Sequence, residues 1–266
     1  MKKFSTKNTS NNRYLRHSLI DWFDQESLKK SFVIVVGAGA IGNEVIKNLC
    51  LLGIGKIHIV DFDKIELHNL TRNVLFNEKH IGKYKAEIAA KTCKLLSPNT
   101  KVTYSTNDFW NSLSISRIAE SNGVFCCVDN FEARIKLNQL CLIAQVDFYN
   151  TGIDSRFVSI EKYPFRMEPN CACYECNLPT SVYTRINERY SCGWLKKRAY
   201  EESKIPTTII TSSLAGGGIC SLFLQQNHTD SISGSVKCLT DSIKLNTTVT
   251  QLLKNNACIT CSNYSI

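Results

Sequence analysis

The sequence lacks an apolar run that fits a membrane span. Its longest apolar stretch, residues 205–224, is interrupted by Pro206, by several Ser and Thr residues and by the glycines at 216–218. A membrane-spanning helix needs about 20 predominantly apolar residues. We therefore expect this stretch to form a buried core helix, or two helical pieces hinged at the glycines, and we expect no membrane among the partners.

An N-terminal apolar signal core, internal repeats and long low-complexity tracts are also missing. Residues 1–12 are polar and are expected to form a disordered tail. Without a secretory signal the chain is expected in the cytoplasm, where thiols stay reduced. The 13 cysteines are therefore expected to be buried hydrophobes or metal ligands rather than disulfides. Cysteines in apolar runs fit the first role: Cys50, Cys126, Cys127, Cys141 and Cys220.

Concentrated positive charge is missing too, although the formal net charge is +9. The basic clusters at residues 29–30 and 196–198 are too short for a nucleic-acid footprint. We interpret the excess as a solvated basic surface and expect no nucleic-acid partner.

The chain does contain alternating strand and helix patterns. Runs of β-forming residues occur at 32–36, 56–60, 102–104, 124–128 and 148–153, with helical patterns at 40–52, 83–96 and 134–145 between them. Strands that alternate with helices predict an α/β fold with a doubly wound, mainly parallel, Rossmann-like sheet. Residues 13–30 carry an amphipathic pattern and are expected to be a helical arm. A Cys-rich C-terminal subregion is expected to pack on the same sheet.

A phosphate-binding loop is indicated by Gly37, Gly39 and Gly42, which form G-x-G-x-x-G between an expected strand and an expected helix. The first glycine allows a tight turn, the second lets backbone N–H groups approach phosphate, and the third lets helix and strand pack closely. The helix N-terminus also favours an anion. Asp61 ends the next strand, where a carboxylate can bind both ribose hydroxyls. This pattern predicts nucleotide binding but leaves ATP and NAD open.

Further charged residues at strand ends favour ATP. Arg72 and Lys85 can neutralise a triphosphate, and Asp129, after a central apolar strand, can hold Mg²⁺. Ligands of open α/β sheets bind at such strand ends. An NAD site needs none of these charges, so a dehydrogenase becomes a distant alternative. The opposing interpretation of Arg72 and Lys85 is ordinary surface charge.

These motifs resemble the ThiF/MoeB and ubiquitin-activating-enzyme family from Arg13 to Cys261. The matching motifs, in order, are Arg13-Tyr14-Leu15-Arg16, the D-x-D of Asp61 and Asp63, the N-L-x-R of Asn69 to Arg72, the G-x-x-K of Gly82 to Lys85, and the D-N-x-x-x-R of Asp129 to Arg134. The resemblance implies a homodimer that uses ATP to adenylate the C-terminal carboxylate of a ubiquitin-like protein. A conjugating enzyme or a sulfur donor is a further partner that it allows.

The resemblance also implies roles for individual residues. The phosphate loop would be Gly37, Gly39, Ala40 and Gly42, with Ala40 standing where many members have Gly. Asp61 and Asp63 would lie in the nucleotide site, with Asp61 on the ribose. Asn69, Arg72 and Lys85 would bind phosphates. Asp129 would bind Mg²⁺ beside Asn130. Arg16 would reach into the partner subunit's site, and Asn73 replaces a common Gln.

Two C-x-x-C pairs suggest a structural zinc site. Cys173 and Cys176 form one pair, and Cys258 and Cys261 form the other. Four thiolates in two such knuckles suit a closed tetrahedral Zn²⁺ site, and the family resemblance supports this assignment. Cys171 could replace Cys173 as a ligand, although the x-x spacing favours Cys173.

Cys192 is a candidate nucleophile. It precedes Pro206 in the order in which family members often place a cysteine that accepts the acyl group, and basic neighbours can favour its thiolate. The alternative is an unreactive loop or core thiol.

The sequence therefore predicts one adenylating domain at residues 13–266. Its nucleotide-binding part would span about 31–155, and its zinc- and substrate-binding part about 156–266. Two other functions remain open: activation of a ribosomally made peptide for modification, and a non-catalytic scaffold that binds a ubiquitin-like protein.

Overall fold

The computed structural model describes residues 12–190, 206–225 and 232–262. Most of the expected N-terminal tail lies outside these residues, as does Cys192. Within the described residues no helix is both long enough and apolar enough to cross a membrane.

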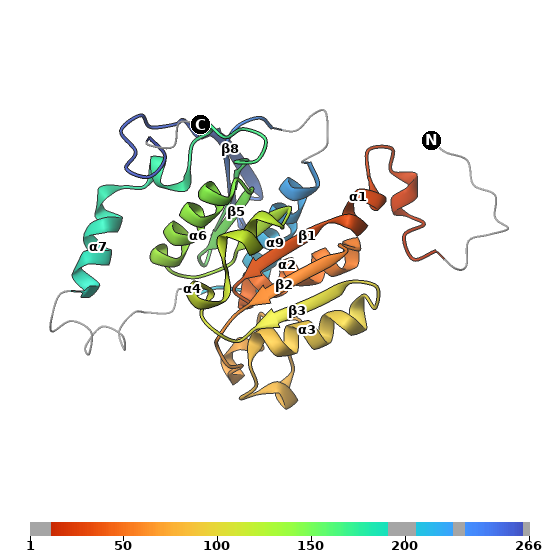
Figure 1. Ribbon diagram of the computed structural model, residues 1–266. Helices are drawn as coiled ribbons and strands as arrows, with labels where there is room; N and C mark the ends of the chain where they lie inside the picture. The colour runs from red at the N-terminus through yellow and green to blue at the C-terminus, as the bar shows by residue number, and fades with distance from the viewer. Residues whose placement is uncertain (1–11, 191–205, 226–231, 263–266) are drawn as a thin grey trace.

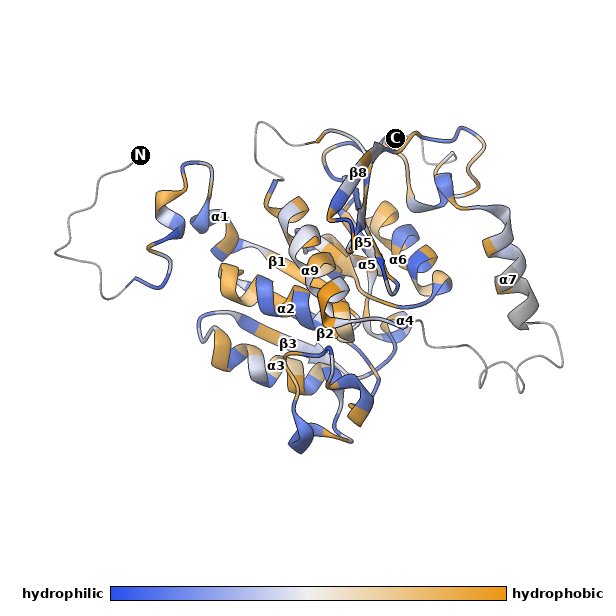
Figure 2. Cartoon of the chain, turned by 180° about the vertical axis from the view of Figure 1, so that it is seen from behind, coloured by the Kyte–Doolittle hydropathy of each residue, from blue (hydrophilic) through white to orange (hydrophobic). Residues whose placement is uncertain are grey.

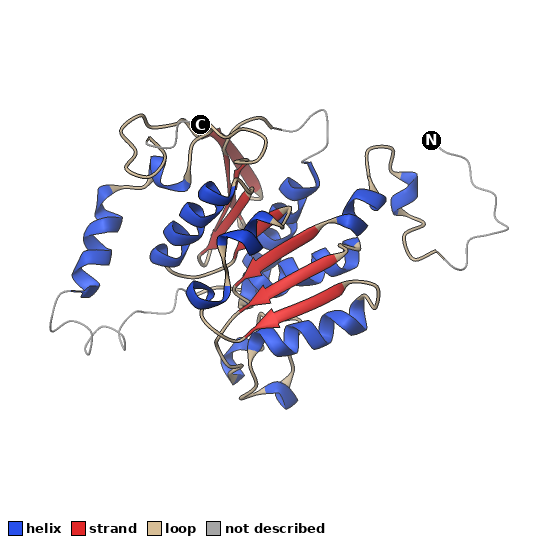
Figure 3. Ribbon diagram, viewed as in Figure 1, coloured by secondary structure: helices blue, strands red, loops and turns tan. Residues whose placement is uncertain are grey.

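A mixed sheet of eight strands forms the centre of the molecule, in the order β3-β2-β1-β4-β5-β6-β7-β8 (Figure 3). The strands β3, β2, β1, β4 and β5 are parallel, and β6, β7 and β8 extend the sheet in antiparallel fashion. The bounds are β1 Phe32–Val36, β2 Lys56–Val60, β3 Lys101–Ser105, β4 Gly123–Cys126, β5 Phe148–Ile153, β6 Phe157–Tyr163, β7 Val236–Asp241 and β8 Asn246–Gln251. The prediction of a doubly wound, mainly parallel sheet is confirmed.

Helices cover both faces of the parallel part. Val33 and Val35 of β1 pack with α2 (Ala40–Leu52), α3 (Lys85–Leu96) and α9 (Ile209–Leu224), which lie in front in Figure 2. Ile34 and Val36 point to the other face and pack with α4 (Phe109–Ser112), α5 (Ile115–Ala119) and α6 (Phe131–Ala144), which lie in front in Figure 1. Because successive side chains of a strand alternate, one apolar strand supplies both cores.

The long apolar stretch forms one continuous helix, α9, so the alternative of two hinged pieces is wrong. A Cβ atom at Gly216 would come within 2.4 Å of the Cβ of Glu44 on α2. A Cβ at Gly218 would come within 2.3 Å of the Cδ1 of Ile160 on β6. The glycines therefore allow α9 to pack closely between α2 and the sheet.

The N-terminal arm is less helical than expected. Only a short 3₁₀ turn, η2 (His17–Leu19), and a six-residue helix, α1 (Gln25–Lys30), form within residues 13–30. The arm instead packs against the C-terminal ends of two other helices, α2 and α3. Arg13 donates to the carbonyl of Leu96 at 2.5 Å, and Tyr14 lies against Gly53, the C-cap of α2. The apolar side chains of the arm thus pack on other elements, and they do not form one face of a continuous helix.

The C-terminal half joins the same sheet through β6, β7 and β8. Between β6 and β7 the chain forms a 3₁₀ turn, η5 (Tyr174–Asn177), then α7 (Thr180–Tyr190), and later α9. In Figures 1 and 2, α7 projects away from the body of the molecule. Two further 3₁₀ turns, η3 (Leu67–Asn69) and η4 (Glu78–His80), follow β2. The boundary near residue 155 stays a prediction.

Candidate functional site

The glycine loop between β1 and α2 fits tightly against the end of β4. Gly37 has a left-handed φ of +93°, and a Cβ atom there would come within 2.6 Å of the carbonyl oxygen of Cys127. A Cβ at Gly42 would come within 1.9 Å of the carbonyl oxygen of Gly37. Gly39, the N-cap of α2, has no atom within 4 Å of its would-be Cβ. Two glycines are thus required by the fold, while the third leaves backbone open to a ligand.

Asp61 supports this loop directly. Its Oδ2 accepts a hydrogen bond from the amide of Ala38 at 2.6 Å, and its Oδ1 accepts from the amide of Asp63 at 2.8 Å. Burial raises the pKa of the Asp61 carboxyl from the ordinary 3.8, and the charge of Lys85 and the two amides oppose that rise. A carboxylate that already meets the phosphate loop is well placed to meet a ribose as well.

The segment after β2 is held against the start of α3. Ile65 N donates to Lys83 O at 2.9 Å, and Lys85 N donates to Asp63 O at 2.9 Å. The Lys85 ammonium forms a salt bridge to the carboxylate of Asp63 at 2.7 Å. Lys85 is thereby brought beside Asp61, although it is 22 residues further along the chain from Asp63. The two motifs that the sequence suggested separately form one cluster.

Asn69 is the last residue of the 3₁₀ turn η3 after β2, and Arg72 lies in the turn that follows it. The Asn69 Oδ1 accepts from the amide of Glu66 at 3.0 Å, so this buried side chain stabilises its own turn. The Arg72 guanidinium donates to the carbonyl of His68 at 2.9 Å. Among the described residues, Arg72 forms no salt bridge with a carboxylate, which leaves its charge available for an anion.

Asn43 is a structural residue of the candidate site that could not be recognised from the sequence. It is fully buried on α2, and its Nδ2 donates to the carbonyls of Ala38 at 2.7 Å and Gly39 at 3.1 Å. Its Oδ1 accepts from the amide of Leu75 at 2.9 Å. One side chain therefore joins the glycine loop to the segment with Arg72. The available signal was a polar residue on the apolar face of a helix.

Asp129 and Asn130 lie on the other side of the loop, between β4 and α6. Asp129 is exposed, whereas Asn130 caps α6 by accepting from the amide of Ala133 at 2.8 Å. Arg134 donates to the carbonyl of Val128 at 2.5 Å and to the Oδ1 of Asn150 at 2.6 Å. Strand β4 ends at Cys126, earlier than expected, and the carbonyl of the next residue, Cys127, lies against Gly37.

These groups meet where the strand order reverses. β1 pairs with β2 on one side and with β4 on the other, so the loops that follow all three strands share one edge of the sheet. Open α/β sheets bind ligands at this switch point. These loops and the start of α3 carry the expected nucleotide residues: Gly37, Gly39, Ala40, Gly42, Asp61, Asp63, Asn69, Arg72, Lys85, Asp129 and Asn130.

Arg16 is not part of this cluster. It is exposed on the arm, which contacts the C-terminal ends of α2 and α3. Those helix ends lie at the opposite edge of the sheet from the glycine loop, beside the start of β1 (Figure 1). Arg16 therefore cannot contribute to the site of its own chain without moving across the sheet.

The two C-x-x-C pairs form one buried cluster. The sulfur atoms of Cys173, Cys176, Cys258 and Cys261 all lie within 4.8 Å of one another. Neighbouring sulfur atoms are 3.6 Å apart for Cys173 and Cys258, and 3.3 Å apart for Cys176 and Cys261. A tetrahedron with Zn–S bonds of about 2.3 Å has sulfur–sulfur edges of about 3.8 Å. The cluster therefore fits a tetrahedral metal ion.

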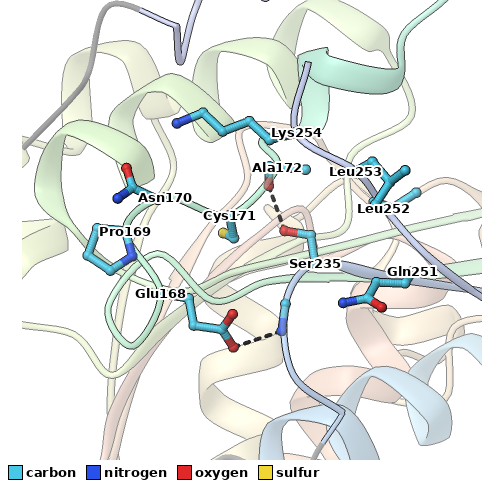
Figure 4. A pocket seen from close by; sticks show the side chains of 11 residues that line it. Glu168, Pro169, Asn170, Cys171, Ala172, Ser235, Gln251, Leu252, Leu253 and Lys254 are labelled. Atoms are coloured by element: carbon cyan, nitrogen blue, oxygen red, sulfur yellow. Dashed lines mark hydrogen bonds between the residues drawn. The ribbon is translucent and has the colours of Figure 1, made fainter. Parts of the chain in front are cut away.

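Cys171 is not part of the cluster, so the alternative ligand assignment is wrong. It lines a separate cavity of about 440 Å³, together with Glu168, Ser235 and Lys254 (Figure 4). Burial raises the pKa of its thiol to about 11. The five cysteines that lie in apolar runs are buried, as predicted: Cys50, Cys126, Cys127, Cys141 and Cys220.

Comparison with known proteins identifies relatives over most of the chain. Residues 11–258 match the ThiF family. Ubiquitin-like modifier-activating enzyme 5 of Drosophila willistoni is 32% identical over 216 residues, which cover 77% of this chain and 50% of that protein. The Aedes aegypti protein of the same name is 31% identical, over 70% of this chain and 48% of the relative. The chain thus spans about half the length of these relatives.

Solved structures share the fold. MccB of E. coli, solved with ATP, superimposes with a TM-score of 0.75 at 22% identity and covers 96% of this chain and 75% of its own. PaaA superimposes with a TM-score of 0.69 at 18% identity, covering 93% of this chain and 86% of its own. The fold, the glycine loop with its charged neighbours and the sequence match over residues 11–258 agree, and the chain belongs to the ThiF family.

Proposed function

We propose that this chain binds ATP and adenylates a carboxylate, the C-terminus of a ubiquitin-like protein or of a peptide. The observation that carries this proposal is that Asp61 contacts the glycine loop at the switch point, with Lys85 bound to the neighbouring Asp63. Arg72 and Asp129 lie on the segments that follow β2 and β4 at the same end of the sheet. The relatives are ubiquitin-like modifier-activating enzymes, which supports a ubiquitin-like substrate. The MccB structure solved with N-formylated MccA supports a peptide as the second candidate.

The proposed chemistry is mostly electrostatic. Backbone N–H groups of the loop and the N-terminus of α2 would bind phosphate, and Asp61 would accept hydrogen bonds from the ribose. The substrate carboxylate, already ionised at neutral pH, attacks the α-phosphorus in line, the bond to the bridging oxygen breaks, and pyrophosphate leaves. Arg72 and Lys85 would offset the negative charge that develops on the phosphates. No general base is required.

Asp129 would hold Mg²⁺. Its carboxylate is exposed, and its one described hydrogen bond, from the Nδ2 of Asn130, is long at 3.5 Å. A free carboxylate oxygen beside a phosphate loop suits this hard cation, which would supply charge neutralisation to the phosphates. Exchange of labelled pyrophosphate into ATP tests the proposal, because label enters ATP only when adenylation runs in both directions.

Zn²⁺ would be held by Cys173, Cys176, Cys258 and Cys261 and would have a structural role, because the four thiolates leave no open position. Cys171 provides a matched control for this assignment. Metal analysis should find one zinc per chain in Cys171→Ser and none in the double variant Cys173→Ser with Cys258→Ser. Stoichiometric zinc in that double variant would place the ligands elsewhere.

We also propose a homodimer in which Arg16 enters the partner subunit's site. The position of the arm at the far edge of the sheet supports this arrangement. Cys192 is proposed as the acceptor of the acyl group: its thiolate would attack the acyl-adenylate, forming a thioester and releasing AMP. A conjugating enzyme or a sulfur donor would then be a later partner, and the cytoplasm fits the reduced cysteines.

A further inference from the structure

A buried carboxylate lies between the two cysteine knuckles and is not part of the proposed metal site. Glu175 occupies the second x of Cys173-Tyr174-Glu175-Cys176 and is 6% exposed. Among the described residues it forms no salt bridge. Burial of an ionised carboxylate is costly unless hydrogen bonds replace its hydration. The position of Glu175 therefore depends on the donors around it.

Four side chains from three other parts of the chain donate to Glu175. Its Oε1 accepts from the Oγ1 of Thr260 at 2.7 Å, from the Nε2 of Gln139 at 3.1 Å and from the Nδ2 of Asn138 at 3.4 Å. Its Oε2 accepts from the hydroxyl of Tyr183 at 2.8 Å. Every donor is uncharged, and each comes from an element that must be in place for the carboxylate to stay buried.

These donors connect the four-cysteine cluster to two helices. Thr260 lies between Cys258 and Cys261, so its bond to Glu175 joins the same two knuckles that the metal would join. Asn138 and Gln139 belong to α6, and Asn138 also accepts from the amide of Tyr174 at 3.0 Å. Tyr183 belongs to α7, which otherwise projects away from the body of the molecule (Figures 1 and 2).

We propose that Glu175 is a positioning residue that couples metal occupancy of the four-cysteine cluster to the placement of α7. With the metal bound, both knuckles are fixed and Thr260 keeps its hydrogen bond to the Oε1 of Glu175. The Oε2 of Glu175 then accepts from the hydroxyl of Tyr183. When the metal leaves, the knuckles separate, the carboxylate regains water, and α7 loses this anchor. The inference rests on the proposed zinc site, whose occupancy is measured separately below.

The test is amide hydrogen exchange of residues 180–190 in the full chain, with zinc bound and after removal by a chelator. Zinc content is measured on each sample. In the wild type, chelation should speed exchange in this segment about tenfold, the factor expected for losing one hydrogen bond to a charged group. Exchange in β1, an interior strand that is buried along its whole length, reports whether the whole fold has opened.

Tyr183→Phe separates coupling from simple stability. It removes the hydroxyl but leaves every metal ligand, so the variant should keep full zinc content. When Co²⁺ replaces zinc, the cobalt-thiolate spectrum should be the same as in the wild type. Residues 180–190 should already exchange about tenfold faster with zinc bound, and chelation should add no further increase. Thr184→Val removes the neighbouring hydroxyl, which donates to the carbonyl of Thr180 in the same helix at 3.3 Å. It is the matched control and should behave like the wild type.

The conservative variant Glu175→Gln keeps one acceptor oxygen and should restore part of the protection that Glu175→Ala loses. The proposal is overturned if zinc-loaded Tyr183→Phe exchanges like the wild type, or if chelation still speeds its α7 exchange tenfold. A wild-type protein that contains no zinc would contradict the metal assignment instead, and the zinc measurement distinguishes that failure from failure of the coupling.

Discussion

The side-chain amide of Asn43 donates to Ala38 O at 2.7 Å while its oxygen accepts from Leu75 N at 2.9 Å. Two loops that follow different strands are therefore fixed by one buried side chain. Asn43→Ala should remove three hydrogen bonds between this side chain and backbone groups, and should destabilise the fold by about 2–4 kcal/mol. Chemical denaturation measures this loss. Asn48→Ala, on the same helix but partly exposed, should cost far less; equal losses would contradict the assigned role.

The glycine loop predicts opposite outcomes for two glycines. Gly42→Ala places a methyl group against the carbonyl of Gly37 and should reduce the melting temperature sharply. Gly39→Ala meets no atom within 4 Å and should melt like the wild type. Its methyl group would, however, occupy the space through which phosphate approaches the backbone, so ATP affinity should fall at least tenfold, measured by calorimetry. Unchanged ATP affinity in Gly39→Ala would place the phosphates elsewhere.

The buried carboxyl of Asp61 predicts a pH dependence. Its pKa is raised above the ordinary 3.8, so protonation begins at a higher pH than for an exposed Asp. Below that pKa the neutral carboxylic acid is a poorer acceptor for ribose hydroxyls, and ATP affinity should fall there. Asp61→Asn should bind ATP weakly at every pH and should lose this dependence. Identical pH profiles for the two proteins would show that another group titrates.

The contribution of Asp61 to the free energy of unfolding changes with pH in the opposite direction to its contribution to ATP affinity. The folded state holds the Asp61 proton more tightly than the unfolded state, so the contribution of this group is fully present below pH 3.8 and is lost as pH rises through the raised pKa. The wild type should therefore lose stability relative to Asp61→Asn over that interval. Denaturation at several pH values gives the difference, and a constant difference would argue against the raised pKa.

Arg16 and Asp129 predict complementation between subunits. Arg16→Ala and Asp129→Ala should each be inactive alone. In a two-fold dimer, random subunit exchange between them should restore about a quarter of the wild-type activity, because each mixed dimer regains one intact site. Light scattering or mass spectrometry must confirm that mixed dimers form. Mixed dimers without activity would place Arg16 in the site of its own chain or outside any site.

Much of this site could be predicted from the sequence because the carboxyl ends of parallel strands meet at one edge. Gly37 to Gly42, Asp61 and Asp129 each directly follow an apolar run, and that position alone brings them close. Asn43 could not be predicted, because a polar residue within a helix shows its backbone partners only after two loops have folded around it. Arg16 was assigned by resemblance, and the structure shows only that it lies far from its own site.

The strands β6 and β7 were missed for a different reason. Both carry buried or half-buried polar side chains, so the alternation that identifies a strand is obscured. Glu161 of β6 is 5% exposed and accepts from Asn150 at 2.7 Å, from Ser159 at 2.9 Å and from Tyr163 at 3.1 Å. These polar side chains can be buried only once all their hydrogen-bond partners are in place, and the sequence does not show those partners. The amphipathic arm was over-predicted as helix, because its apolar residues pack on helix ends.

Substrate-dependent exchange of labelled pyrophosphate into ATP is the most direct test of the proposed adenylation. The account predicts exchange that requires Mg²⁺ and a protein or peptide with a free C-terminal carboxylate. Asp129→Ala should abolish it, and Arg72→Ala should slow it by about 10²-fold or more, whereas the exposed Lys79→Ala should leave it unchanged. Undiminished exchange in Asp129→Ala, or saturable NAD binding without ATP binding in the wild type, would contradict the account.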